Sequence, residues 1–309
     1  MMLPPRLSLA LRSLALSAAV AVGVLLAGGT LTAQDGDGQA QPQMESGPQA
    51  LPSLDVAAVS ERQPLLLQRA FAGLQATRTD PSPQLFFVAF AGYGPEAVFK
   101  REALAVRELF DARFGTKGRS VVLVNHASTV GDIALASPAN LAEALRRVGS
   151  LMNPDTDVLF LFLTSHGRKD LLAVEMPGFA FDGLTPTELK SMLDDAQIGN
   201  RVIVISACHA GSFIPLLQSP TSLVIAAAHA DRASFGCEDR REWTYFGDAF
   251  FNRALRRERS FERAFARAKT LIGRWESREA LTRSLPQIGG GEALRERLDA
   301  LTRAALSPE

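Results

Sequence analysis

The sequence has 309 residues, of which 47% are hydrophobic and 21% are charged, with 33 basic and 33 acidic side chains. This apolar fraction can fill a core, which excludes a chain that is disordered throughout. The balanced charge argues against a dedicated nucleic-acid binder, which needs excess positive charge to neutralise phosphates. Two cysteines are too few for a disulfide-stapled scaffold or a four-cysteine zinc site. An ordinary globular protein of one large or two small domains remains.

The first 50 residues differ from the rest. Residues 1–33 combine a positive start at Arg6 and Arg12 with an uncharged apolar run over 14–27 and small residues after it. This pattern predicts a signal peptide, with an uncleaved N-terminal anchor as the alternative. Either predicts an exported protein, periplasmic or extracellular, that contacts a membrane only if the segment is retained as an anchor. Residues 34–50 are rich in Gly, Gln, Asp and Pro and predict a flexible linker, which leaves 51–309 as the folded domain.

From residue 51 onward, amphipathic helices alternate with apolar strands. Four helices are expected in this part: over 54–75, from the glycines at 92 and 94 to residue 114, over 138–152 and over 185–196. Five strands are expected over 85–90, 120–124, 157–163, 201–205 and 223–227. The last third is expected to be helical, over 246–257, 260–276 and 292–304. Strands that are apolar on both faces are typical of a mainly parallel sheet covered on both sides. The sequence therefore predicts a three-layer α/β/α domain.

Two of these strands deliver a histidine and a cysteine to one edge of the sheet. Residues 164–167 (Thr-Ser-His-Gly) follow one strand and residues 206–208 (Ser-Ala-Cys) follow the next. Chemistry in open sheets gathers at the carboxyl ends of the strands, where Cys208 and His166 form a candidate nucleophile and proton-transfer partner. The backbone N–H groups of Gly167 and Cys208 form a candidate oxyanion hole. On spacing alone, the alternative is a buried Cys208 and a loop histidine without catalytic roles.

These motifs resemble those of the caspase-like cysteine peptidase clan. Within it they are most similar to the legumain-type family, peptidase C13, and to its exported bacterial branch. The resemblance covers roughly residues 85–287. It includes 159–167, an apolar strand ending in Ser-His-Gly, and 204–208, a strand ending in Ser-Ala-Cys. Shorter motifs follow in the same order, at 226–227, 234–237, 244–247 and 284–287.

The resemblance implies a caspase-like fold and a cysteine-type endopeptidase. In such an enzyme Cys208 attacks a peptide carbonyl, and His166 protonates the leaving amine. The N–H groups of Gly167 and Cys208 hold the oxyanion, and water then hydrolyses the thioester. The family needs no metal or organic cofactor, and its partner is a peptide or protein substrate. In this clan the histidine and cysteine need no tight hydrogen bond before substrate arrives, and an orienting Asp or Asn is not obligatory.

The sequence departs from animal and plant legumains around the implied substrate pocket. Ser165 and Ser206 stand where those enzymes carry acidic residues, and 98–102 (Val-Phe-Lys-Arg-Glu) replace their Asn-Tyr-Arg-His motif. Arg101 and Glu102 remain candidates for a charged pocket, with Ser234 at the position of the family's pocket serine. The alternative for Arg101 and Glu102 is a solvated helix face. Cleavage after Asn is therefore not implied.

The remaining histidines and the second cysteine have other candidate roles. His126 follows the strand at 120–124 and is a candidate for substrate contact, whereas His209 and His229 are expected to be neighbours or structural residues. Four scattered histidines without ligand spacing do not indicate a metal site. A disulfide between Cys208 and Cys237 would silence the nucleophile.

Three other functions remain open besides hydrolysis. A transpeptidase would use the same residues, with an amine in place of water. A non-catalytic protein on the same fold would hold a peptide in the cleft, although it would need neither Cys208 nor His166. A thiol redox protein would use Cys208 and Cys237, against which stands the lack of a Cys-x-x-Cys pair.

Overall fold

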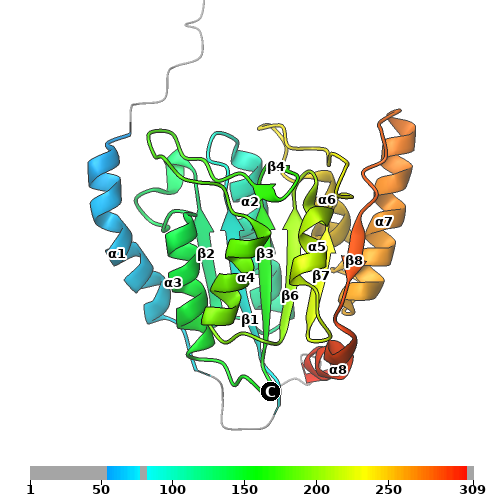
Figure 1. The fold of residues 1–309 in the computed structure, drawn as a ribbon, viewed down its shortest axis with the longest axis horizontal. Coiled ribbons are helices and arrows are strands. Elements are labelled where there is room, and N and C mark those ends of the chain that lie inside the picture. Colours follow the sequence, from blue (N-terminus) through cyan, green and yellow to red (C-terminus); the bar gives the residue numbers. More distant parts are fainter. Residues whose placement is uncertain (1–53, 77–81, 305–309) are drawn as a thin grey trace, which may run out of the picture. The chain divides into compact units, whose positions relative to one another are not determined.

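A sheet of six strands forms the centre of the fold (Figure 1). The computed structural model describes residues 54–76 and 82–304, so the predicted signal peptide or anchor and the linker lie outside the described residues. The strand order is β2-β1-β3-β6-β7-β8. Five strands are parallel and the last is antiparallel: β1 (Leu85–Ala91), β2 (Ser120–Val124), β3 (Val158–Thr164), β6 (Arg201–Ser206), β7 (Ser222–Ala226) and β8 (Gln287–Gly289).

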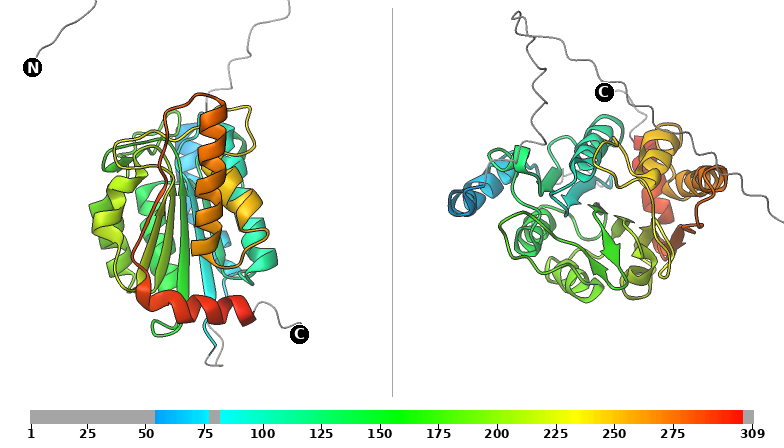
Figure 2. Two further views of the ribbon diagram at one scale, coloured as in Figure 1. Left: turned by 90° about the vertical axis from the view of Figure 1, so that its right-hand side faces the viewer. Right: turned by 90° about the horizontal axis from the view of Figure 1, so that it is seen from above.

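Helices cover both faces of this sheet, which Figure 2 shows nearly edge-on in its left view. One face carries α1 (Val56–Ala72), α3 (Pro138–Gly149), α4 (Pro186–Asp195) and the 3-10 helix η2 (Ala210–Phe213) with α5 (Ile214–Leu217). The other carries α2 (Ala97–Arg113), α6 (Tyr245–Gly247), the π-helix η3 (Asp248–Ala254) and α7 (Phe261–Arg278). The predicted three-layer α/β/α architecture is therefore confirmed. No helix among the described residues is long and apolar enough to cross a membrane.

Smaller elements complete the chain. A two-stranded hairpin of β4 (Gly167–Arg168) and β5 (Leu171–Leu172) follows β3, and η1 (Ala127–Thr129) follows β2. The chain ends with η4 (Glu292–Leu294) and α8 (Arg295–Ala304). The hairpin lies above the carboxyl ends of the parallel strands, at the top of Figure 1, and α8 lies at the opposite end.

The strands are apolar throughout because both of their faces are buried. Along β1, Phe86 and Val88 pack into the cluster beneath α3 and α4, whereas Phe87 and Ala89 pack into the cluster beneath α2 and α7. The same alternation continues in β3, β6 and β7. Side chains of successive strand residues point to opposite faces, so an uninterrupted apolar run supplies two cores at once.

Local signals explain where the helices begin. Thr185 and Glu188 form a reciprocal capping box at the start of α4, with Pro186 in the first turn. Ser137 caps α3 by accepting a hydrogen bond from the N–H of Asn140. These caps satisfy backbone donors that a helix start otherwise leaves unpaired.

The C-terminal third differs from the prediction in two respects. The helix expected over 246–257 is instead the short α6 continued by the π-helix η3, which ends at Ala254. The strand β8 was not expected, because three residues next to Gly290 and Gly291 carry no strand pattern. Those glycines have φ of +72° and +84°, a left-handed turn that lets the chain leave the sheet edge.

Phe110 lies at the centre of the core between α2 and the sheet. Its ring centroid lies 4.8 Å from that of Phe87 and 4.3 Å from that of Phe160, and it also contacts Phe114, Phe251 and Phe261. The side chain is fully buried. These contacts join α2, β1, β3, η3 and α7 through one aromatic cluster.

A buried carboxyl group ties α2 to the ends of two central strands. Glu102 is fully buried and accepts hydrogen bonds from Thr164 Oγ1 (2.6 Å) and from Thr244 Oγ1 and N (2.7 and 3.3 Å). The Thr244 hydroxyl also bonds to Ser206 Oγ at 3.1 Å. Burial raises the pKa of Glu102 to about 7, although these hydrogen bonds oppose the shift. Glu102 thus links the last residues of β3 and β6 to the start of α6.

We expect Phe110→Ala to lower the free energy of unfolding by about 3–5 kcal/mol, because it removes a fully buried ring and leaves a cavity. Urea unfolding would measure the loss, with an unchanged m value showing that only stability has changed. Leu65→Ala on α1 is the matched control, because this side chain is 47% exposed and its truncation is expected to change little. A loss at Phe110 no larger than at Leu65 would contradict the central role of the aromatic cluster.

Glu102→Gln should change how stability depends on pH. The folded protein keeps the Glu102 proton up to about pH 7, whereas the unfolded chain releases it near pH 4.5. Glu102 therefore lowers the free energy of unfolding progressively as pH rises from about 4.5 to about 7, by roughly 3 kcal/mol in total. We expect the stability of the variant relative to the wild type to rise by that order between pH 5 and pH 8. Urea unfolding across this range measures it.

Glu108→Gln is the control for this experiment, because Glu108 lies on the same helix and is exposed. Its stability should follow that of the wild type at every pH. Parallel curves for the Glu102 variant and the wild type would show that the carboxyl is ionised in the folded state near pH 5, contrary to our expectation.

Candidate active site

The pairing of β3 with β6 brings the predicted histidine and cysteine loops together. The strands are parallel and in register, with Thr164 opposite Ser206, so both loops leave the sheet at the same level. The loops also touch: a Cβ atom on Gly167 would lie 2.5 Å from the carbonyl oxygen of Cys208. Only glycine fits this close approach. His166, which directly precedes Gly167, and Cys208 therefore lie on two loops that contact each other.

Cys208 is partly buried and is a free thiol. The backbone N–H of Ser234 donates a hydrogen bond to its Sγ at 3.2 Å, and the carbonyl oxygen of Ser234 lies 3.5 Å from the same sulfur. Both contacts come from the backbone of Ser234, so they fix the position of the sulfur relative to this segment. The chain then turns at His209, whose φ is +58°. The His209 ring bonds through Nδ1 to the carbonyl of Ala230 at 2.9 Å.

Three residues contact His166: Tyr93 and Glu96 from the loop between β1 and α2, and Phe99 from the first turn of α2. Its Nε2 lies 2.9 Å from Oε2 of Glu96. The rings of Tyr93 and Phe99 meet the imidazole edge-on, with centroid distances of 4.5 and 5.2 Å. The imidazole remains 36% exposed, so substrate can reach it.

Glu96 was not among the residues singled out from the sequence. It precedes His166 by 70 residues, and no local motif connects the two. The topology supplies the connection, because β1 lies next to β3 and the loop after β1 opens at the same edge. The available signal was an acidic residue in the loop that follows the predicted strand 85–90, after the glycines at 92 and 94.

Arg101 binds a distant loop. Its Nε donates to the carbonyl of Arg241 at 3.1 Å, and Nη2 also bonds to the carbonyls of Asp239 and Arg241. The carboxylate of Glu242 lies 3.5 Å from Nε. The side chain is 28% exposed, so part of the guanidinium can still face a ligand. Arg101 thereby fastens the loop after Cys237 to α2.

Glu102 and two of the serines lie inside the protein. Glu102 is fully buried, so the solvated helix face considered for it is wrong; its neighbours in the fold, and not its helix, decide its environment. Ser165 is buried and donates to the carbonyl of Ala173 at 2.7 Å. Ser206 is buried against Thr244. These three groups are hydrogen-bonded within the protein, while Ser234 contacts Cys208 through its backbone.

The other candidates lie in ordinary structural environments. Nδ1 of His126 lies 2.8 Å from Ser128 Oγ and 3.3 Å from Lys100 Nζ; burial and the nearby Lys100 lower the pKa of His126. Cys237 is a free thiol whose pKa is raised by burial. Cys208 is also a free thiol, so the disulfide that would silence the nucleophile is not formed. Within residues 54–76 and 82–304, no group of His, Cys, Asp and Glu side chains is arranged to hold a metal ion.

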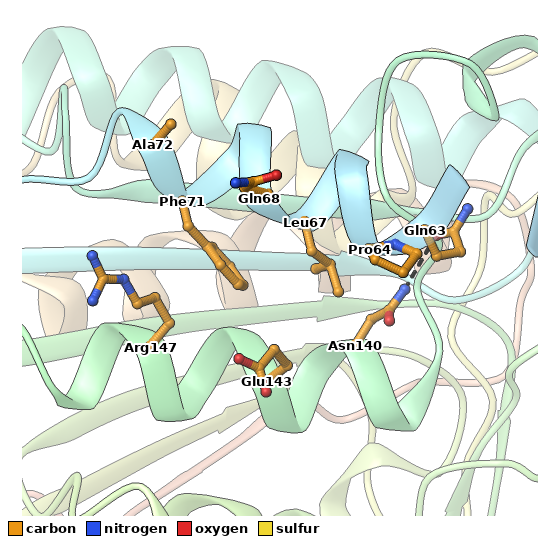
Figure 3. Close-up of a pocket in the computed structure, with 9 residues that line it drawn as sticks. All are labelled: Gln63, Pro64, Leu67, Gln68, Phe71, Ala72, Asn140, Glu143 and Arg147. Atoms are coloured by element: carbon orange, nitrogen blue, oxygen red, sulfur yellow. Dashed lines mark hydrogen bonds between the residues drawn. The ribbon is translucent and has the colours of Figure 1, made fainter. Parts of the chain in front are cut away.

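A groove of about 650 Å³ lies elsewhere, between α1 and α3 (Figure 3). Leu67 and Phe71 of α1 face Glu143 and Arg147 of α3 across it, and Asn140 bonds to the Gln63 side chain at one end. Its lining contains no Cys, His, Ser or Thr. The groove therefore offers no nucleophile, and the candidate chemistry stays at the ends of β3 and β6.

Comparison with known proteins bears on this site. Residues 139–289, which include His166 and Cys208, match the model of the Peptidase C13 family. The sequence matches none of the curated proteins with which it was compared. Among solved structures, it is similar to caspase-1 from Spodoptera frugiperda, with 13% identity, a TM-score of 0.49, and coverage of 70% of this chain and 92% of that one. The similarity to the peptidase C13 family thus extends over residues 139–289, from the start of α3 to the end of β8.

Proposed function

We propose that this protein is a cysteine-type endopeptidase in which Cys208 is the nucleophile and His166 the proton donor. The match of residues 139–289 to the Peptidase C13 family model supports a peptidase of this general type. The observation that carries the specific proposal is the register of β3 and β6, which starts the two loops at one level. The contact between Gly167 and the backbone of Cys208 supports it.

The proposed reaction begins with attack of the Cys208 sulfur on a peptide carbonyl carbon. The thiol proton passes to His166 as the sulfur attacks, while the N–H of Ser234 donates to the sulfur. The carbonyl oxygen becomes an oxyanion, which the N–H groups of Gly167 and Cys208 would hold. The C–N bond then breaks as His166 returns the proton to the leaving amine. Water hydrolyses the resulting thioester and regenerates the thiol.

We place the substrate pocket next to this dyad, with Arg101 and the Ser234 segment as its candidate residues. Arg101 is half-buried and adjoins the loop that also contains Cys237, and Ser234 contacts the nucleophile itself. The buried Glu102, Ser165 and Ser206 support the loops from within. The proposed partner is a peptide or protein substrate. It would meet the enzyme outside the cytosol, because residues 1–33 are proposed to direct export of this protein.

The purified protein should react selectively at Cys208 with peptidyl thiol-reactive probes that differ in their terminal side chain. We expect one probe type to label Cys208, as mapped by mass spectrometry, because only a site with a substrate pocket discriminates between side chains. Cys208→Ala should abolish peptide cleavage, and His166→Ala should slow labelling and cleavage by roughly 100-fold or more. Cys237→Ala is the matched control and should cleave as the wild type does.

Each other outcome identifies a different function. Peptide binding without labelling would favour a non-catalytic binding protein. Ligated products in the presence of an amine nucleophile would show transpeptidation by the same dyad. Labelling of both cysteines without side-chain preference, and only after reduction, would favour a redox protein and overturn the proposal.

A further inference from the structure

The contact between Glu96 and His166 has the geometry of a charge-assisted hydrogen bond. The two atoms, Oε2 and Nε2, lie 2.9 Å apart, within the range for an imidazole N–H and a carboxylate. Both side chains are partly shielded from water, at 36% exposure for His166 and 29% for Glu96. Glu96 also lies at the start of the 17-residue helix α2, where the helix dipole favours negative charge.

Capping of α2 does not explain why the Glu96 carboxylate lies at this position. Glu96 occupies the N-cap position, with an extended backbone, but its side chain makes no capping hydrogen bond. The first free N–H of the helix, that of Ala97, is instead bound by Oδ1 of Asp239 at 2.7 Å, from a loop 142 residues further along the chain. The Glu96 carboxylate therefore has no capping role at this helix start, and it contacts the histidine instead.

Two aromatic side chains near Glu96 also contact the imidazole of His166. Tyr93 and Phe99 contact the ring at interplanar angles of 85° and 77°. Two hydrogen bonds attach the start of α2 to the loop after Cys237. The N–H of Ala97 donates to Asp239 Oδ1, and Arg101 Nε donates to the carbonyl of Arg241. The imidazole is therefore oriented by residues 93–99, which are in turn anchored by the loop after Cys237.

We infer that Glu96 is the positioning residue of the proposed peptidase: it accepts the Nε2–H of His166 and so leaves Nδ1 unprotonated, as the nitrogen that accepts the thiol proton. The inference rests on the proposed function. In the acylation step the Cys208 thiol proton moves to Nδ1 and then to the leaving amine, while Glu96 stays ionised and faces the positive imidazolium. A carboxylate that fixes the tautomer and stabilises the imidazolium lowers the barrier without touching substrate.

The test compares Glu96→Gln, Glu96→Asp and the control Glu175→Gln with the wild type. Glu175 is exposed and lies near enough for its charge to raise the pKa of Tyr93, so its variant removes a nearby charge but not the contact with His166. We expect Glu96→Gln to lower kcat by roughly tenfold or more with little change in KM. Glu96→Asp should recover part of this loss, and Glu175→Gln should retain wild-type activity. Urea midpoints of the Glu96 variants should match that of the wild type, because Asp239 caps the helix.

A spectroscopic measurement tests the pairing without any turnover. In ¹⁵N-labelled Cys208→Ala protein, neutral His166 should carry its proton on Nε2, and adding Glu96→Gln should abolish this preference; His166→Ala assigns the signals. If the wild type neither cleaves peptides nor labels at Cys208, the proposed function fails while the tautomer still reports on the pair. If the wild type is active and Glu96→Gln has equal kcat and an unchanged tautomer, the positioning role is overturned and the endopeptidase stands.

Discussion

The in-register pairing of β3 with β6 is the constraint on which the rest of the site depends. Because Thr164 lies opposite Ser206, the loops that bear His166 and Cys208 leave the sheet together, and no hydrogen bond between their side chains is needed to bring them near. Gly167 then permits backbone contact between the loops. A one-residue slip would turn every side chain of β6 to the opposite face and would exchange two buried apolar sets. Packing in the two cores therefore fixes the register of β6 against β3. This register in turn fixes where the loops with His166 and Cys208 leave the sheet.

Glu102 extends this constraint from the sheet to the helix layer. Its carboxyl group accepts hydrogen bonds from the hydroxyl groups of Thr164, at the end of β3, and Thr244, just before α6. The Thr244 hydroxyl also bonds to that of Ser206 in β6. Gly247 has no room for a side chain because the Glu102 carboxyl group occupies that space. The raised pKa reflects the price of burial, which the hydrogen bonds offset only in part. A buried polar network of this kind specifies one arrangement of its elements, since each group must find its own partner.

The fold could be predicted from the sequence to the extent that its signals are local. Apolar runs such as 157–163 indicate strands buried on both faces, and strand ends locate Cys208 and His166. The β8 edge strand could not be predicted, because its three residues depend on pairing with β7. Glu96 lies beside His166 only because β1 neighbours β3, and Glu102 is buried only because Thr164 and Thr244 converge on it. Such contacts join residues 62–142 positions apart, which no helix or strand period reveals.

The same network gives a physical reason for Ser206, where animal and plant legumains carry an acidic residue. Its hydroxyl is one hydrogen bond from Thr244, which in turn binds Glu102 at 2.7 Å. A carboxylate at position 206 would place a second acid in the same buried region, and like charges there cannot both stay ionised. A serine hydroxyl instead donates to Thr244 without adding charge. The carboxylate that contacts His166 is that of Glu96, which lies at the start of α2 and is 29% exposed, outside this buried network.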